Sequence, residues 1–420
     1  MQESLRTQMI LRKFLEVSIF LSFLLLPFTL AGHNVFYTLA VVAGMMGGIW
    51  WSQKNWLLRE PLVWALGFLF LLVCVGSFYS LSTWDAALGE NFNKYLKLFL
   101  GIIFIAALKN EVLRKRAFLA FYAGMVFLLA CTYLNIWIDL PWSLTKNRGW
   151  GVDHTVFGNY ITQNIMMSFF VLQNFFLFAK FKPFPWKWLF ALLAVLAVVS
   201  ILYLSNGRTG YLVLFAGTFA YLIFALPKRL VGLGILGVII VCSIAFATSP
   251  RVQERYERAH NETVLLFEQY GRGELPTFTS IGARWYMWIK SLELVQERPW
   301  TGWGLGSHGI KWCEKAPEPD WCGVGDTTPH NQFIFFAVEL GILGVLGFLF
   351  LLGALIWGGW HGGMYRPLMM GFIAIFIGDS LVNASLWNAR EYNFFIIMMC
   401  LLYSMTRAQA EGNMTDVRGS

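Results

Sequence analysis

Long apolar runs alternate with short polar segments along most of this chain. About twelve of the runs are long enough to cross a bilayer as helices. They cover residues 14–32, 34–52, 61–80, 94–108, 117–138, 158–179, 188–205, 210–227, 230–249, 330–357, 367–384 and 392–406. We therefore predict an all-α polytopic membrane protein, with helices 1–9 in residues 1–249, a hydrophilic segment at 250–329, helices 10–12 in 330–406 and a tail at 407–420.

The composition agrees with this class. Hydrophobic residues make up 57% of the chain and charged residues 13%, which is too little polar surface for a water-soluble protein of this length. We therefore attribute the formal net charge of +8 to membrane topology and to contact with lipids. The sequence has no basic patch interleaved with aromatic residues of the kind that binds nucleic acid. The first apolar run lacks a small-residue cleavage site after it, so we expect a retained helix and not a signal peptide.

The positive charges favour one orientation. Loops on the side of the N-terminus carry clusters such as Lys109, Arg114, Lys115 and Arg116. The opposite short loops carry fewer positive residues, namely Lys94, Lys146, Arg148, Arg208 and Arg390. By the positive-inside rule both termini are cytoplasmic, and the segment 250–329 lies outside the cytoplasm.

That hydrophilic segment has helical periodicity in two places. The first set of apolar positions is Val252, Tyr256, Ala259, Val264 and Phe267, and the second is Ile281, Trp285, Trp288, Ile289, Leu292 and Val295. Both sets predict amphipathic helices, and the second is expected to lie along the membrane surface with Arg284 and Lys290 off its apolar stripe. A separate small soluble domain is the alternative, but the segment is short for a core of its own.

The cysteines divide by position. Cys313 and Cys322 lie in the hydrophilic segment, where an oxidising compartment would allow a disulfide, while the other four lie in apolar runs. We predict the bridge and no metal site, because zinc would require further Cys or His at ligand spacing. The external side also has no Asp-x-Asp pair for a divalent cation, so arginines would have to stabilise any diphosphate leaving group.

Arg208 is the least expected charge in the sequence. It lies between two apolar runs, where a charge is costly and marks a functional site by default, although anchoring to lipid phosphate is an equal alternative. For Arg284, on a predicted amphipathic helix, contact with lipid headgroups is a more common role than catalysis. Glu339, Asp379 and Asn383 are intramembrane polar residues that either pair with one another or line a cavity.

His330 stands out among the histidines by its position. The run Thr327-Thr328-Pro329-His330-Asn331 predicts an N-cap threonine, a proline in the first turn and the start of the tenth span. A helix N-terminus disfavours the imidazolium, so this imidazole should be neutral and able to act as a general base. The alternative is a capping or interfacial histidine without chemistry.

Four motifs in this order resemble the O-antigen ligase family (WaaL). They are Ser205-Asn206-Gly207-Arg208-Thr209-Gly210, Arg284-Trp285, Trp303-Gly304-Leu305-Gly306, and His330-Asn331 leading into Glu339-Leu340-Gly341-Ile342-Leu343-Gly344. The resemblance covers most of the chain, although a serine directly before the arginine is common where Gly207 stands here. The motifs are partly shared with O-antigen polymerases (Wzy) and bacterial O-linked oligosaccharyltransferases, which usually continue into a sizeable extracytoplasmic C-terminal region.

The resemblance implies a GT-C-type glycosyltransferase of the bacterial inner membrane. Its donor would be an undecaprenyl-diphosphate-linked glycan and its acceptor lipid A-core oligosaccharide, joined at the periplasmic face by a metal-independent, inverting reaction without a cofactor. Arg208 and Arg284 would bind the diphosphate and His330 would take the acceptor proton. Asn331 and Asp379 are expected among the substrate-binding residues.

Two other functions remain open from the sequence. An O-antigen polymerase would use the same donor with an undecaprenyl-linked acceptor. A lipid-linked glycan transporter is the alternative from another class, since many transporters share twelve spans and cytoplasmic termini. We find no internal repeat joining the two halves, and the candidate residues gather at one face instead of the bilayer midplane, which favours the enzyme.

Overall fold

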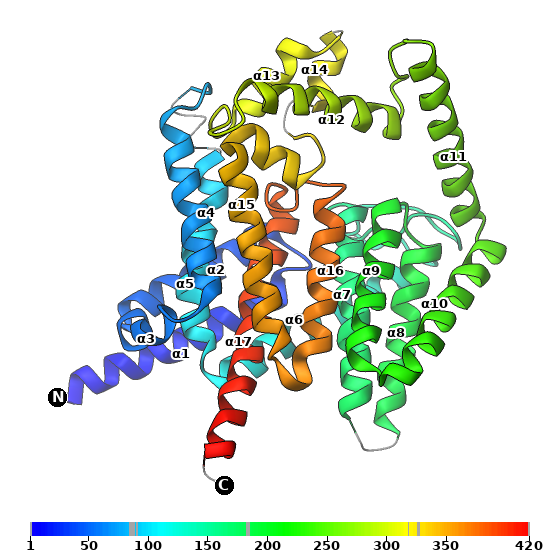
Figure 1. The fold of residues 1–420 in the computed structure, drawn as a ribbon. Helices are drawn as coiled ribbons and strands as arrows, with labels where there is room; N and C mark the ends of the chain where they lie inside the picture. The colour runs from blue at the N-terminus through cyan, green and yellow to red at the C-terminus, as the bar shows by residue number, and fades with distance from the viewer. Residues whose placement is uncertain are drawn as a thin grey trace.

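The computed structural model describes residues 2–83, 89, 91–181, 185–317, 319–325 and 328–418, and these residues form helices without any strand (Figure 1). The first nine helices are α1 (Gln2–Leu25), α2 (Leu30–Met46), α3 (Ile49–Leu57), α4 (Pro61–Phe78), α5 (Asn93–Leu108), α6 (Glu111–Leu134), α7 (Tyr160–Lys180), α8 (Trp186–Tyr203) and α9 (Arg208–Ala225). They are followed by α10 (Lys228–Thr248), α11 (Pro250–Gly271), α12 (Ser280–Glu297), α13 (Ser307–Lys315), α14 (Pro319–Gly325), α15 (Gln332–Trp360), the 3-10 turn η2 (Gly363–Tyr365), α16 (Arg366–Ser380) and α17 (Ala389–Arg418).

Seven of the described helices are long and apolar enough to cross a bilayer, namely α4, α6, α7, α8, α9, α10 and α15. The bent pair α2 and α3 is an eighth candidate. The remaining predicted spans are also helical, as α1, α5, α16 and α17, but α5 and α16 have only 16 and 15 residues. The all-helical prediction is therefore confirmed, and length and composition support seven or eight of the twelve expected spans.

The first two predicted spans end at different places from those expected. The chain leaves α1 before Pro27, and the Thr29 side chain accepts a hydrogen bond from the Gly32 amide at 3.2 Å, which begins α2. The second predicted span is broken by an 87° bend between α2 and α3. Gly48 lies there with φ 67°, a left-handed conformation that glycine adopts without steric cost.

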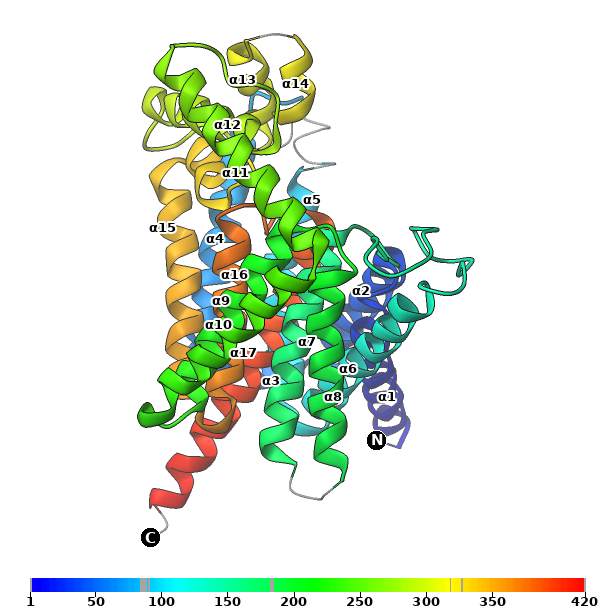
Figure 2. The ribbon, with the colours of Figure 1, turned by 90° about the vertical axis from the view of Figure 1, so that its right-hand side faces the viewer.

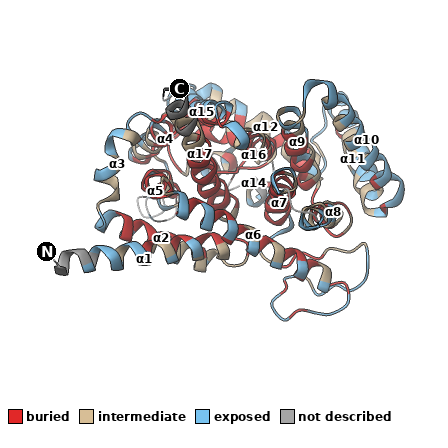
Figure 3. Ribbon diagram, turned by 90° about the horizontal axis from the view of Figure 1, so that it is seen from below, coloured by how far each residue is buried: buried red, intermediate tan, exposed pale blue. Residues whose placement is uncertain are grey.

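The helix α17 forms the centre of the bundle. All of residues 391–406 are buried, and Figure 3 shows α17 among α5, α7, α15 and α16. Phe395 packs on Phe376 of α16 with ring centroids 4.6 Å apart, and Phe394 packs on Phe169 of α7 at 5.8 Å. A helix that is apolar on every face requires neighbours on every face, and this one has them.

Glycines bring α9, α16 and α7 close together. A Cβ atom on Gly217 of α9 would lie 2.6 Å from Ile375 Cγ1, and one on Gly371 of α16 would lie 2.6 Å from Leu172 Cδ1 of α7. Small residues at such contacts let helix backbones approach in a membrane, where packing is the main attraction. This contact fixes α9, and with it the residues at its N-terminus.

The segment from α11 to α14 covers one end of the bundle. In Figure 1, α12 runs across the top with α13 and α14 beside it, while both chain ends lie in the lower part. Figure 2 shows α11 climbing from the end of α10 to this layer. Only 6% of the most apolar stretch of α10 is buried, so α10 lies at the edge of the bundle and most of its surface is exposed.

The buried face of α12 differs from the predicted apolar stripe. Trp285 and Leu292 of that stripe are exposed, whereas Tyr286, Met287 and Leu294 are buried. The buried side packs on Trp312, Trp321 and α15. The periodicity of the sequence predicted burial of the most apolar face of α12. The neighbouring face of α12 is buried instead, because it packs on the aromatic residues of α13 and α14.

The glycine-aromatic loop after α12 joins onto a break in α15. Gly341 has φ 67° and ψ −159° inside that helix, which frees carbonyl groups of the preceding turn. The Val338 and Glu339 carbonyls accept hydrogen bonds from the amides of Trp303 and Gly304, at 2.8 and 2.9 Å. The Glu339 side chain accepts the Gly306 amide at 2.8 Å. Glu339 thus anchors the loop.

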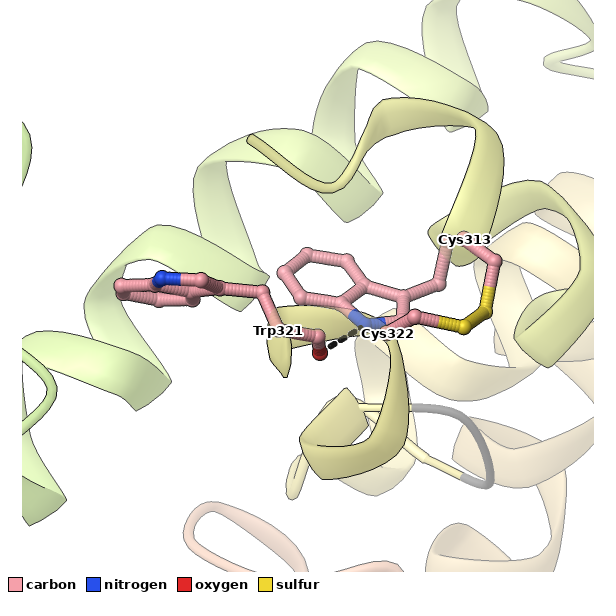
Figure 4. Close-up of a disulfide and its surroundings, with 4 residues drawn as sticks. Cys313, Trp321 and Cys322 are labelled. Atoms are coloured by element: carbon pink, nitrogen blue, oxygen red, sulfur yellow. Dashed lines mark hydrogen bonds between the residues drawn. A yellow bond between two sulfur atoms is a disulfide. The ribbon is translucent and has the colours of Figure 1, made fainter. Parts of the chain in front are cut away.

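Cys313 and Cys322 form the disulfide that the sequence predicted (Figure 4). The bridge joins α13 to α14, and the Trp312 indole N–H donates to the Trp321 carbonyl at 3.0 Å beside it. Trp312 is fully buried against Tyr286 of α12. The disulfide therefore closes the aromatic layer on the outer side of α12.

Candidate functional site

Arg208 is the first residue of α9, directly after the turn that follows α8. The glycines of its motif fit against α7. A Cβ atom on Gly207 would lie 2.8 Å from Tyr160 Cδ2, and one on Gly210 would lie 2.5 Å from Asn164 Nδ2. Asn164 also donates to Ser205 Oγ at 2.8 Å. The motif therefore packs the helix start onto α7 and leaves the arginine side chain at the end of the bundle.

The Arg208 guanidinium is paired with Glu262 of α11, at 3.2 Å between Nη2 and Oε2. The same carboxylate oxygen accepts the Ile281 amide of α12 at 3.2 Å. Arg208 is 27% exposed and Glu262 is 12% exposed. The Glu262 carboxylate therefore joins the start of α9 to α11 and α12.

Arg284 belongs to the same charge cluster. Burial lowers the pKa of Arg284, and the positive charge of Arg208 lowers it further, while Tyr160 and Glu262 act in the opposite direction. A guanidinium remains protonated despite such shifts. Arg208 is paired with Glu262, and the charge of Arg284 lies close enough to both groups to be influenced by them. This leaves an excess of positive charge suited to an anion.

His330 lies outside α15, one residue before the cap of that helix. The cap is Asn331, whose Oδ1 accepts the amides of Phe333 and Ile334 at 3.0 and 3.1 Å. The predicted threonine cap is therefore wrong: Thr328 Oγ1 instead accepts the His330 amide at 3.4 Å, and Thr327 lies outside the described residues. Asn331 supplies the side-chain acceptor that the first amides of a helix require, and it lies closer than the threonines to the apolar run that forms α15.

The backbone holds His330 in an uncommon conformation. Its φ is 51°, in the left-handed region that non-glycine residues seldom adopt. The Trp288 indole N–H of α12 donates to the preceding Pro329 carbonyl at 2.9 Å. The His330 imidazole is therefore positioned by the strained backbone of His330 itself, by the hydrogen bond from Trp288 and by the capped start of α15.

The His330 ring is kept neutral by its surroundings. Burial lowers the pKa of His330 to about 4, and the charge of Arg284 contributes in the same direction. The helix dipole that the sequence suggested is not the main cause. Nδ1 is buried and has no hydrogen-bond partner among the described residues. A neutral imidazole with one unpaired nitrogen can accept a proton.

A second histidine, which is fully buried, lies near His330. His308 of α13 contacts Ser291 Oγ through Nε2 at 3.2 Å, and its ring packs edge-on against Phe335 at 5.8 Å between centroids. Burial lowers the pKa of His308 to about 3, and protonation of His330 would lower it further. His308 is fully buried and serves to pack α13 on α12 and α15.

The two other predicted substrate-binding residues have structural partners. Asn331 caps α15, and its Nδ2 donates to the Leu381 carbonyl at 3.0 Å. Asp379 is fully buried and accepts hydrogen bonds from Asn383 and Ser385 at 2.7 and 2.6 Å. Both residues shape the connection between α16 and α17, next to His330.

A cavity of about 360 Å³ lies beside His330. Its lining includes the start of α7, the connection from α16 to α17 and the first turn of α17, with Asn159, Asn383, Asn388, Arg390 and Glu391 among the polar residues. Neither Arg208 nor Arg284 lines it. His330 therefore lines this cavity and also lies close enough to Arg284 for that charge to lower its pKa.

Sequence reasoning missed Glu262, Arg251, Arg390 and Glu391. Glu262 is 54 positions from its partner Arg208, and no local spacing relates the two. Arg251 of α11 donates to Asn206 Oδ1 and to the Gly151 carbonyl, which also ties α11 to the turn before α9. Adjacent charges at 390 and 391, at the start of an apolar run, were the one available signal for the cavity.

Comparison with known proteins relates part of this chain to one family. Residues 190–349 match the family described as O-Antigen ligase, a range that includes Arg208, Arg284 and His330. An uncharacterized protein of Haemophilus influenzae (strain ATCC 51907 / DSM 11121 / KW20 / Rd) is 24% identical over 207 residues, which are 47% of this chain and 49% of that protein. The match thus spans about half of the relative.

Proposed function

Since residues 190–349 match the family described as O-Antigen ligase, we propose that this protein is a lipid-linked-oligosaccharide-dependent glycosyltransferase of the O-antigen ligase type. It transfers a glycan from undecaprenyl diphosphate to lipid A-core oligosaccharide in lipopolysaccharide biosynthesis. The observation that carries the proposal is the neighbourhood of two arginines and a neutral histidine, whose Nδ1 has no partner among the described residues, at one end of the helical bundle.

The chemistry assigns a role to each group. An acceptor sugar hydroxyl attacks the anomeric carbon from the face opposite the diphosphate, which inverts the configuration. The new carbon–oxygen bond forms as the bond to the diphosphate breaks, and the leaving oxygen keeps the electron pair. Arg208 and Arg284 stabilise the growing negative charge, and His330 takes the hydroxyl proton.

The arginines can perform this role without a metal in the proposed reaction. A guanidinium is planar and permanently charged, and it offers paired donors to phosphate oxygens. The half-buried position of Arg284 strengthens such contacts, because the dielectric there is lower than in water. Holding two lipid-linked substrates at one membrane boundary supplies the proximity that the reaction needs.

We further propose the GT-C-type arrangement with twelve spans, in which α1, α5, α16 and α17 also cross the bacterial inner membrane. Both termini would face the cytoplasm and α11–α14 would face the periplasm. The positions of the chain ends, away from α12–α14, support the placement of these two parts on opposite sides of the membrane (Figure 1).

Transfer in vitro tests the proposal. Purified protein is incubated with an undecaprenyl-diphosphate glycan and lipid A-core in the presence of a chelator, and a parallel reaction offers an undecaprenyl-linked acceptor. We expect glycosylated lipid A-core in the first reaction. Product only in the second would make the protein an O-antigen polymerase, and movement of intact donor across vesicles without bond cleavage would make it a transporter.

A further inference from the structure

The cavity beside His330 has a polar lining from distant parts of the chain. Asn159 comes from the turn before α7, Asn383 and Asn388 from the connection between α16 and α17, and Glu391 from α17 itself. Amide and carboxylate groups around an opening of about 360 Å³ suit the hydroxyl groups of a sugar ring. His330 is the one proposed catalytic residue in this lining.

Glu391 is held in one position within this lining. It is 1% exposed and accepts hydrogen bonds from Thr162 Oγ1 at 3.1 Å and from Asn388 Nδ2 at 2.8 Å. No cation forms a salt bridge with it among the residues that the structure describes. A fixed buried carboxyl group can orient a sugar hydroxyl through a hydrogen bond.

Arg390 gives the cavity a positive charge. Its guanidinium lies over Gly158, where a Cβ atom would be 2.6 Å from Nε, so the glycine makes room for it. Within the described ranges Arg390 donates a hydrogen bond to the Phe28 carbonyl at 3.3 Å and forms no salt bridge. A half-buried guanidinium with five donors and one such acceptor is suited to an anionic ligand.

We infer that this cavity is the acceptor site, and that it takes an anionic sugar whose nucleophilic hydroxyl faces His330 while its phosphate or carboxylate group contacts Arg390. The inference rests on the proposed glycosyl transfer and extends it. It separates the two substrates: the diphosphate donor uses Arg208 and Arg284, and the acceptor uses Arg390 and Glu391. His330 lies between these sites and takes the proton.

Acceptor binding without donor tests the inference independently of turnover. The probe is purified lipid A-core oligosaccharide, titrated against the full-length protein in nanodiscs. The variants are Arg390→Ala and Arg390→Gln, with Arg148→Ala as the matched control, because Arg148 is exposed and paired with Asp139 on the connection between α6 and α7. We expect wild type and control to bind alike and both Arg390 variants to bind roughly tenfold more weakly.

Two modified probes distinguish the anionic groups. Dephosphorylated and carboxyl-reduced acceptors are titrated against wild type and Arg390→Gln, and the difference between the proteins should vanish for the probe that lacks the contacted group. In transfer assays the acceptor KM should rise with the donor KM unchanged. Equal acceptor binding by a folded Arg390→Gln protein, a change confined to the donor KM, or no acceptor binding by wild type would each overturn the inference. Acceptor binding by a wild type that transfers nothing would instead contradict the proposed function alone.

Discussion

The Arg208 guanidinium is bound to Glu262, 3.2 Å away, and the same carboxylate oxygen accepts the amide of Ile281 at the start of α12. The Glu262 carboxylate is therefore bound to the arginine that we assign to the donor diphosphate. The carboxylate and the diphosphate are both anions and compete for the N–H donors of Arg208, so the distance between Arg208 and Glu262 must increase when the diphosphate binds.

Glu262→Gln should therefore strengthen donor binding. The amide oxygen can still accept from Ile281, while the charge that competes with the diphosphate is gone. The pair is partly exposed, so we expect the donor Kd to fall only about threefold. Titration of the donor against the purified variant measures this. A higher donor Kd for Glu262→Gln than for wild type would contradict this prediction and would mean that Glu262 chiefly positions Arg208.

Arg208→Ala and Arg284→Ala should each reduce transfer on the order of 10²–10³-fold, because each removes a charge-assisted contact to the leaving group. Lysine at either position should restore little, since an ammonium cannot form the paired contact of a guanidinium. Steady-state rates measure the effect, with Arg148→Ala as the control. Wild-type turnover by folded Arg208→Ala protein would remove that residue from the site.

The transfer rate should depend on pH through His330. Its pKa is lowered to about 4, so the ring is neutral above that value, and protonation should slow transfer only as the pH falls through it. Removing the positive charge in Arg284→Gln should raise the pKa of His330, moving this acid limb to higher pH. The pH profile of the residual rate reports the shift. A wild-type limb at the ordinary histidine value of 6.5 would contradict the burial argument.

Loss of the disulfide should loosen the layer formed by α13 and α14. Cys313 and Cys322 are nine positions apart, and closing a short loop of this kind stabilises a protein by about 2–3 kcal/mol. Cys313→Ser with Cys322→Ser should lower the Tm, while Cys242→Ser should not. Mass spectrometry of non-reduced peptides checks the bridge itself, and two free thiols in protein isolated from the membrane would refute it.

The sequence was most informative where the signal was local. Apolar length predicted the helices, and the charge between two apolar runs identified Arg208 at the start of α9. Two cysteines in one hydrophilic segment predicted their pairing. Each of these patterns depends on residues close together in the chain, or on one strong cost such as a charge at a membrane boundary.

The missed features depend on packing between distant segments. The cap of α15 is Asn331 and not a threonine, because several residues in that run could cap and tertiary contacts decide which one does. The cavity combines residues near 159, 330 and 390, and no spacing in the sequence brings these together. The face of α12 that is buried was set by Trp312 and Trp321, which lie beyond the helix.

The role of His330 is the central claim, and donor affinity measured together with single-turnover transfer tests it most directly. The variants are His330→Ala and Arg208→Ala, with His361→Ala as control, since His361 is exposed at the far end of α15. His330→Ala should bind donor within about twofold of wild type yet transfer on the order of 10²–10⁴-fold more slowly, because a general base acts in the transition state. Arg208→Ala should lose donor affinity as well as rate. Unchanged transfer by folded His330→Ala protein, or a loss of rate fully explained by weaker donor binding, would contradict the assignment.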